Sequence, residues 1–396
     1  MTAVVGLDAR GTGPTPAGFV RNPPGEVVPL RWEHGRWTVP EGDPHALRGL
    51  RVHWPDRAAD HAPDPAPDPA VDAAPGGPVA ASRDPHPVLA PLLDLAAAGV
   101  PLHADKVPAW AVRADPVLAD LLTEEDWLAE PARDTPHCTA ALRREEHSVR
   151  LRRHGQAHRR GAVPHGTPAV SVVMASMRPH LLESALGQIA RQRGVRAEVL
   201  LGLHGFAADH EAVRRAVGAC PLPVTVVEAD AATPFGDVLN LAAAAAGGDH
   251  VAKWDDDDWY GPDHLADLLL ARAHSGAEIV GTAAEFFYLE PLNVTIRRTD
   301  YTSEVWSDHV AGGTILLDRD RFRETGGFPG LPRGVDAAFL KAAHAAGARI
   351  YRTHGLGYML RRGVSARHTW QLPLAHFLRV ASNQWRGFRP SRILAP

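Results

Sequence analysis

Residues 250–262 read His-Val-Ala-Lys-Trp-Asp-Asp-Asp-Asp-Trp-Tyr-Gly-Pro, which sets four consecutive carboxylates between an apolar run and an aromatic pair. Residues 249–254 have the pattern of a short strand, and residues 262–276 that of a helix with proline in its first turn. Acidic residues at the carboxyl end of a strand lie where α/β sheets bind ligands. Like charges this close repel, so the cluster calls for a cation, and Mg2+ or Mn2+ with oxygen ligands fits best. A solvated acidic turn is the plainer alternative.

The composition of the whole chain limits its class. It has 396 residues, 45% of them apolar, which is enough for a packed core and for two domains. Its two cysteines, Cys138 and Cys220, are too few for a disulfide framework, which favours a reducing, cytoplasmic location. No apolar run reaches about 18 residues, so we expect a protein that is soluble or peripheral at the inner membrane face. A formal charge of −4 gives no argument for a nucleic-acid partner.

Residues 1–165 are expected to form an accessory N-terminal region. Residues 56–87 are dominated by Ala, Pro and Asp, a composition that indicates a flexible linker or a long loop. Order returns over residues 88–122 as helix, strand and helix. Residues 141–160 contain seven arginines, which is typical of a solvated helix joining two domains. The sharper alternative is a basic surface for an anionic acceptor or an anionic membrane face.

A regular alternation of strands and helices begins at Pro168. The apolar run 169–174 is typical of a strand buried on both faces of a parallel sheet. The alternation predicts an α/β domain over residues 166–372, with a Rossmann-like mixed sheet and helices on both faces, followed by a tail at 373–396. The other expected strands are 198–201, 224–227, 251–254, 279–280, 284–289, 314–317 and 349–351, and the expected helices are 179–193, 207–219, 235–246 and 337–346.

Five short motifs follow one another between residues 168 and 370. They are Ser-Val-Val-Met-Ala-Ser at 171–176, Phe235-Gly236 with Leu239-Asn240, the acidic run with its flanks at 254–262, Gly312-Gly313-Thr314, and Gly-Val-Asp-Ala-Ala-Phe-Leu at 334–340. In this order they resemble family-2 glycosyltransferases of the GT-A fold. The resemblance implies an inverting hexosyltransferase-type enzyme (EC 2.4) that moves a sugar from a nucleotide diphosphate donor to an acceptor hydroxyl. It also implies Mn2+ or Mg2+ as cofactor and a glycan, polysaccharide or cell-envelope precursor as acceptor.

The resemblance assigns roles to individual residues. By position, Asp255 and Asp257 match the Asp-x-Asp motif that holds the metal, although four Asp in a row leave the register open. His368 is a further candidate metal ligand, because a C-terminal histidine completes the metal shell in several GT-A enzymes. Gly312 and Gly313 are expected to face the acceptor. The expected donor-binding residues are Ala175, Ser176, Arg178, His204, Asn240, Lys253, Asp255 and Asp256.

Attack by an acceptor hydroxyl needs a group that takes its proton, and Asp336 is the candidate for this base. Its structural alternative is an N-cap for the following helix, and the two roles can coexist. His354 and His368 are the next candidates for the base. His204 stands where the family usually has an acidic pair that binds the donor base, so the resemblance does not imply uridine.

Two other functional classes compete with a transferase of sugars. A nucleotidyltransferase uses a similar sheet and metal, but normally has a glycine-rich basic loop after the first strand, where residues 175–179 hold one Arg and no Gly. A non-catalytic scaffold that binds nucleotide sugars would not need both the acidic cluster and Asp336.

Overall fold

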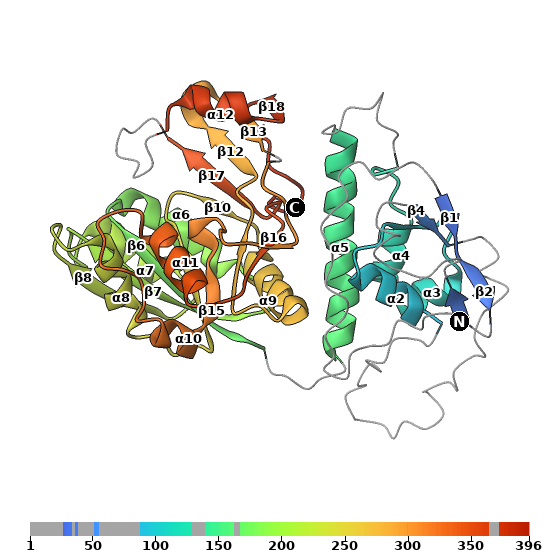
Figure 1. The fold of residues 1–396 in the computed structure, drawn as a ribbon, viewed down its shortest axis with the longest axis horizontal. Helices are drawn as coiled ribbons and strands as arrows, with labels where there is room; N and C mark the ends of the chain where they lie inside the picture. The colour runs from blue at the N-terminus through green and yellow to red at the C-terminus, as the bar shows by residue number, and fades with distance from the viewer. Residues whose placement is uncertain are drawn as a thin grey trace, which may run out of the picture. The chain divides into compact units, whose positions relative to one another are not determined.

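The computed structural model describes residues 27–33, 36–38, 51–54, 88–128, 139–161, 167–298, 300–363 and 372–395. The chain divides into two compact units, Met1–His165 and Gly166–Pro396 (Figure 1). Within the described ranges, no helix combines the length and the hydropathy that a membrane crossing requires. The expected linker at 56–87 and the candidate ligand His368 lie outside the described residues.

The N-terminal unit packs helices against a small parallel sheet. In that sheet β4 (Arg51–His53) lies between β1 (Val27–Pro29) and β5 (Leu102–His103), and β2 (Arg31–Glu33) pairs separately with β3 (Arg36–Thr38). The expected helix, strand and helix over residues 88–122 are confirmed as α2, β5 and α4. The helices of this unit are α2 (Ala90–Ala97), α3 (Ala109–Ala114), α4 (Pro116–Leu122) and α5 (Thr139–Gly161).

The basic segment 141–160 is helical, as expected, but it is not a solvated helix. Arg144 and Arg152 in α5 are buried, and the Arg144 Nε donates a hydrogen bond to a backbone carbonyl. Gly155 brings α5 close to α2, because a Cβ there would lie 2.5 Å from both the Leu93 oxygen and the Ala97 nitrogen. This helix is therefore part of the packing of its own unit, and less of its positive charge is free for an anionic partner than the sequence suggests.

The C-terminal unit is built on an eight-stranded mixed sheet, which confirms the predicted fold class (Figure 1). Four neighbouring strands, β9, β6, β7 and β8, run parallel, whereas β15 pairs antiparallel with both β9 and β11. The sheet order is β14 (Val305–Trp306), β16 (Ile350–Thr353), β11 (Ile279–Thr282), β15 (Leu316–Asp318), β9 (His250–Trp254), β6 (Ala169–Ser176), β7 (Arg196–His204) and β8 (Val224–Ala229).

Helices cover both faces of this sheet. Val170, Val172 and Met174 of β6 enter one apolar cluster and Val173 and Ala175 enter another, because successive side chains of a strand point to opposite faces. The first cluster is completed by α6 (Leu182–Ala190), α7 (Glu211–Ala219) and α9 (His264–Ser275), and the second by α8 (Phe235–Ala243), α10 (Arg319–Glu324) and α11 (Val335–Ala345).

Some expected elements are shorter than the sequence predicts. The helix expected at 179–193 starts as a 3-10 turn, η2 (Pro179–Leu181), before α6. The helix expected from 207 begins only at Glu211, because His210 caps it by accepting a hydrogen bond from the Ala212 amide. The strand expected at 314–317 is split into a 3-10 turn, η4 (Gly312–Thr314), and β15. Each shift comes from a local hydrogen bond or turn that side-chain periodicity does not report.

A second, five-stranded sheet is assembled from segments far apart in the sequence. Residues 373–396, expected as a tail, supply α12 (Leu374–Val380) and β18 to it, and Phe377 of α12 packs on Phe287. Figure 1 shows α12 beside β13 and β18. The sheet order is β10 (Trp259–Tyr260), β17 (Tyr358–Arg362), β12 (Phe286–Leu289), β13 (Val294–Arg297) and β18 (Asn383–Arg386), with the 3-10 turn η3 (Glu290–Leu292) between β12 and β13.

We predict that a chain lacking residues 1–165 folds by itself, because the unit Gly166–Pro396 contains both apolar clusters of the large sheet and all strands of the second sheet. Calorimetry should show one cooperative thermal transition for the shortened protein. Aggregation of the shortened chain, with a cooperative transition only in the full chain, would show instead that residues 1–165 complete the core.

Candidate functional site

The four carboxylates leave the carboxyl end of β9, the strand between β6 and β15. Their side chains alternate in exposure. Those of Asp255 and Asp257 are 30% and 17% exposed, whereas Asp256 and Asp258 are buried. Asp255 and Asp257 can therefore contact a ligand, whereas Asp256 and Asp258 contact only other parts of the protein.

Asp256 is held by two residues at the end of β6. Ser176 Oγ donates to its Oδ2 at 2.5 Å, and the Arg178 guanidinium pairs with both of its oxygens. The same guanidinium contacts Asp257 Oδ2 at 2.6 Å. Burial raises the pKa of Asp256 against the opposing charge of Arg178. Burial alone would lower the pKa of Arg178, but the charges of Asp256 and Asp257 raise it, so this arginine stays cationic between the two carboxylates.

Asp258 joins the acidic turn to the second sheet. It accepts hydrogen bonds from the Tyr358 hydroxyl at 2.6 Å and from the Arg361 amide at 2.9 Å, both on β17. Its own carbonyl accepts from Gln188 of α6. Burial raises the pKa of Asp258 well above its ordinary value, and the neighbouring carboxylates add to this shift. Asp258 therefore fixes the position of the turn.

Asp255 and Asp336 share one buried ammonium group. Lys253 is fully enclosed beneath the turn, and its Nζ lies 2.5 Å from Asp255 Oδ1 and 3.2 Å from Asp336 Oδ1. Burial alone would lower the pKa of Lys253, but the two carboxylates raise it, so the group stays charged. Burial raises the pKa of Asp336, and Lys253 partly opposes that shift. The lysine thus brings together two residues that the sequence places on separate motifs.

Asp336 is not the N-cap of its helix, which corrects the structural alternative. The cap residue of α11 is Gly334, whose positive φ of 70° suits glycine, and no side chain there donates or accepts a capping bond. Asp336 is the second residue of the helix, and its carboxyl points back to Lys253. A carboxylate in a first turn is favoured by the helix dipole, but that position does not require aspartate.

Gly312 and Gly313 make room for the two carboxylates that pair with Lys253. A Cβ on Gly312 would overlap the carboxyl group of Asp336, and one on Gly313 would lie 2.6 Å from Asp255 Oδ2. Tyr260 completes this arrangement, since its hydroxyl accepts from the Asp255 amide at 2.9 Å and donates to the Gly313 carbonyl at 3.0 Å. The sequence offered one signal for Tyr260, its place directly after the acidic run.

The remaining predicted donor residues lie in different surroundings. Ala175 is packed in an apolar cluster at the end of β6. His204, at the end of β7, is 7% exposed, and neither of its ring nitrogens has a hydrogen-bond partner among the described residues. Asn240 exchanges two hydrogen bonds with the backbone of Phe328, at 2.7 and 2.8 Å, so its amide is used to hold the chain after α10. His354 is 1% exposed and lies 3.2 Å from Asp267, which removes it from the surface on which an acceptor would sit.

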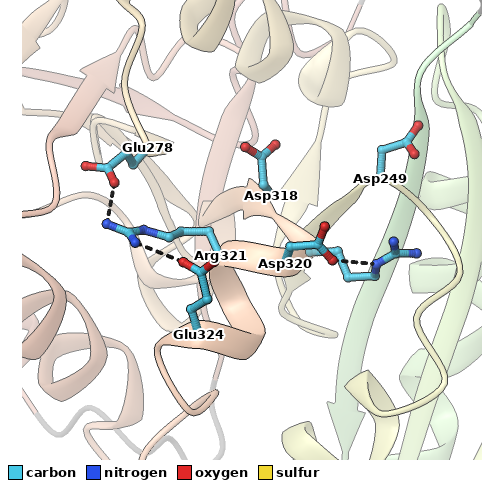
Figure 2. Close-up of a pocket in the computed structure, with 7 residues that line it drawn as sticks. Asp249, Glu278, Asp318, Asp320, Arg321 and Glu324 are labelled. Atoms are coloured by element: carbon cyan, nitrogen blue, oxygen red, sulfur yellow. Dashed lines mark hydrogen bonds and ion pairs between the residues drawn. The ribbon is translucent and has the colours of Figure 1, made fainter.

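A separate pocket of about 460 Å3 opens at the other end of the central strands (Figure 2). Asp249 precedes β9 and Asp318 ends the antiparallel β15, so this pocket faces away from the acidic turn. Figure 2 shows Arg321 reaching both Glu278 and Glu324. The charged groups of the pocket largely pair with each other, and we do not place the chemistry there.

Comparison with known proteins gives structural neighbours only. No family model and no curated protein matches the chain. The mannosyltransferase PcManGT from Pyrobaculum calidifontis, solved with GDP-Man and Mn2+, is 23% identical with a TM-score of 0.41, over 52% of this chain and 60% of its own. TarS 1-349 from S. aureus with UDP-GlcNAc is 15% identical (TM-score 0.41; 54% and 64% covered). GalNAc-T7 with UDP, GalNAc and Mn2+ is 11% identical (TM-score 0.41; 54% and 48% covered).

The aromatic layer beneath the acidic turn contains a buried histidine, His264, which should make the protein less stable in acid. His264 is 2% exposed and sits edge-on to Trp254 and Tyr260, with ring centroids at 5.7 and 5.0 Å. Burial lowers its pKa from 6.5 to about 3. The unfolded chain therefore binds a proton at His264 from about pH 6.5 downwards while the folded chain does not, so stability is lost as the pH falls through this window.

His264→Phe keeps a ring in place and removes this proton. Its free energy of unfolding, measured by urea titration, should fall less steeply than that of the unaltered protein between about pH 6.5 and pH 4. All other titrating groups are common to both proteins and cancel in the comparison. Equal slopes in the two proteins would show that His264 does not contribute to acid sensitivity.

Proposed function

We propose that this chain is a metal-dependent, inverting glycosyltransferase of GT-A type that uses a nucleotide diphosphate sugar as donor and a carbohydrate or cell-envelope hydroxyl as acceptor. The observation that carries the proposal is the buried Lys253 shared by Asp255 and Asp336. It sets a carboxylate of the acidic turn beside a carboxylate that can act as a base. A donor diphosphate and an acceptor hydroxyl need these two kinds of group next to each other.

The charge balance of the site fits a divalent cation. Four carboxylates, those of Asp255, Asp256, Asp257 and Asp336, share two cationic side chains, Arg178 and Lys253, so these groups together carry excess negative charge. Asp255 and Asp257 are the two carboxylates of the acidic turn with exposed oxygen atoms, and Mg2+ or Mn2+ is commonly held by one or two carboxylates together with water and substrate phosphate. When bound, such an ion would supply Lewis-acid stabilisation of the leaving diphosphate.

We propose separate roles in donor binding for the other residues of the site. Arg178, which spans Asp256 and Asp257, would contact a donor phosphate beside the acidic turn. Asp256 and Asp258 keep that turn rigid, so the exposed carboxylates do not need to be ordered when the donor binds. His204 is the proposed contact to the base of the nucleotide, and because both of its ring nitrogens are buried, the ring would have to turn outward to reach that base.

Asp336 is proposed to take the proton of the attacking hydroxyl. Its side chain is 30% exposed, so one edge is accessible to an acceptor, while Lys253 holds the other edge. A single carboxylate base suits direct attack by the acceptor, which inverts the configuration at the transferred sugar because the leaving group departs from the opposite face. Lys253 keeps Asp336 oriented and favours its ionised form.

We predict that donor binding depends on the metal through Asp257. A nucleoside diphosphate brought to these carboxylates without a cation is repelled by several kcal/mol at low effective dielectric. Titration calorimetry should therefore show that the donor binds at least about tenfold more tightly with Mn2+ than with EDTA. In Asp257→Asn this difference in donor affinity between Mn2+ and EDTA should be smaller. Asp320→Asn, at a carboxylate that is 76% exposed and belongs to the other pocket, is the matched control. Equal affinity in Mn2+ and EDTA would contradict the metal role.

Asp336→Asn tests the base. Because Asp336 does not cap α11, the substitution leaves the helix start intact. It removes the proton acceptor and one of the two carboxylates around Lys253, which keeps Asp255 as its partner. Transfer to the acceptor should fall by roughly 100-fold or more while the donor still binds. The melting temperature should fall because Lys253 loses one of its two carboxylates, but thermal unfolding should stay cooperative. Near-normal turnover, with acceptor saturating and donor bound, would exclude Asp336 from the reaction.

Gly312→Ala tests the space around that base. The added methyl group overlaps the Asp336 carboxyl and must displace it, and a displacement of about 1 Å can lower turnover about 100-fold. Gly218→Ala is the matched control, since no atom of the described residues lies within 4 Å of a Cβ at that position in α7. Full activity in Gly312→Ala would mean that the position of Asp336 is not critical.

A further inference from the structure

Three potential metal ligands converge in the N-terminal unit. His154 and His158 lie one turn apart on α5, and Asp115 stands at the start of α4. The Nε2 atoms of the two histidines lie 2.7 and 3.3 Å from the same oxygen of Asp115, Oδ2. All three ligand atoms lie within 4.8 Å of one another. Neither the acidic turn nor the proposed transfer reaction involves these residues.

The carboxylate of Asp115 is fixed before any ion arrives. Its Oδ1 accepts a hydrogen bond from the Leu118 amide at 2.9 Å and caps α4, which leaves Oδ2 directed at the imidazoles. Asp115 is 6% exposed, so its orientation is set by the surrounding protein. A backbone bond of this kind is the sort of outer-shell contact that orients metal ligands in proteins.

The helix that carries the histidines is fixed as well. Gly155, between them in sequence, packs directly on the backbone of α2, and Ser148 Oγ donates to the Gly99 carbonyl at 2.9 Å. The two imidazole rings meet edge to face with centroids 4.7 Å apart. Both sides of the cluster are therefore rigid, and a metal would not have to order them on binding.

We propose that Asp115, His154 and His158 bind a zinc ion that ties α5 to the start of α4. Two imidazole nitrogens and a carboxylate oxygen are a ligand set that zinc uses, with bonds of about 2.0–2.2 Å. In tetrahedral geometry such ligand atoms lie about 3.3 Å apart, which matches the His158 contact and requires the His154 contact to open slightly. A water molecule would fill the fourth position.

A second group, His53, His103 and Asp105, has the same residue types, but its carboxylate is more exposed and less fixed by hydrogen bonds. Asp105 is 67% exposed, and the His103 nitrogen lies 3.9 Å from it. No bond to the backbone is described for the Asp105 carboxylate that would match the one to Leu118. This group serves as the internal comparison for the zinc site.

The test uses the full chain, stripped of metal and then loaded with one equivalent of Zn2+. X-ray absorption at the zinc edge of the unaltered protein should show two imidazole ligands, a result that does not depend on any variant folding. Zinc affinity should fall in His158→Gln by more than the roughly 10–100-fold that loss of an outer-shell contact costs. The matched variants His53→Gln and Asp320→Asn should retain the affinity, because they alter the comparison group and an exposed carboxylate of the pocket at the other end of the sheet.

Three outcomes would overturn the zinc site. They are an absorption spectrum with oxygen ligands only, failure of the protein to retain zinc after desalting, and equal zinc affinity in His158→Gln and the unaltered protein. In each case the cluster is a hydrogen-bonded triad that links two helices. The proposal is independent of the transferase proposal, because its readouts are zinc binding and zinc ligation rather than turnover.

Discussion

The ammonium group of Lys253 is the interaction on which the candidate site depends. It belongs to β9, is buried beneath the acidic turn, and pairs with Asp255 and Asp336, which come from different elements. Removing one partner of a buried ion pair costs about 3–5 kcal/mol, because the remaining charge stays in a low-dielectric environment. Such a cost is tolerated where a fixed charge geometry serves a ligand, and this one sets a proton acceptor beside a carboxylate that faces outward.

The four carboxylates of the acidic run next to Lys253 fall into two groups. Asp256 and Asp258 are satisfied by Ser176, Arg178 and Tyr358, while Asp255 and Asp257 keep exposed oxygens. Without this division, four adjacent carboxylates would compete for the same cation and repel one another. With it, two act as anchors of the turn, and the excess negative charge is concentrated at the two that a metal ion can reach.

Much of the large sheet could be predicted from the sequence because its signals are local. Apolar strands such as β6 and β9 alternate with amphipathic helices, and the acidic run directly follows a strand. The second sheet could not be predicted in this way. A strand was expected at 284–289, where β12 lies, but its pairing with β13 and β17, and the further pairing of β10 and β18, join segments far apart in the sequence. The same holds for the site. The acidic run was visible, but its pairing with Tyr358 and the position of Asp336 beside Lys253 depend on tertiary contacts.

We propose that this site breaks the bond between a sugar and a nucleoside diphosphate. The most direct measurement is to incubate the protein and Mn2+ with a panel of nucleotide sugars and mixed carbohydrate acceptors, and to measure the nucleoside diphosphate that is released. We expect release from at least one nucleotide sugar, dependent on Mn2+ and abolished by EDTA. Release from none of them, together with formation of pyrophosphate from a nucleoside triphosphate and a sugar phosphate, would exclude sugar transfer and identify a nucleotidyltransferase instead.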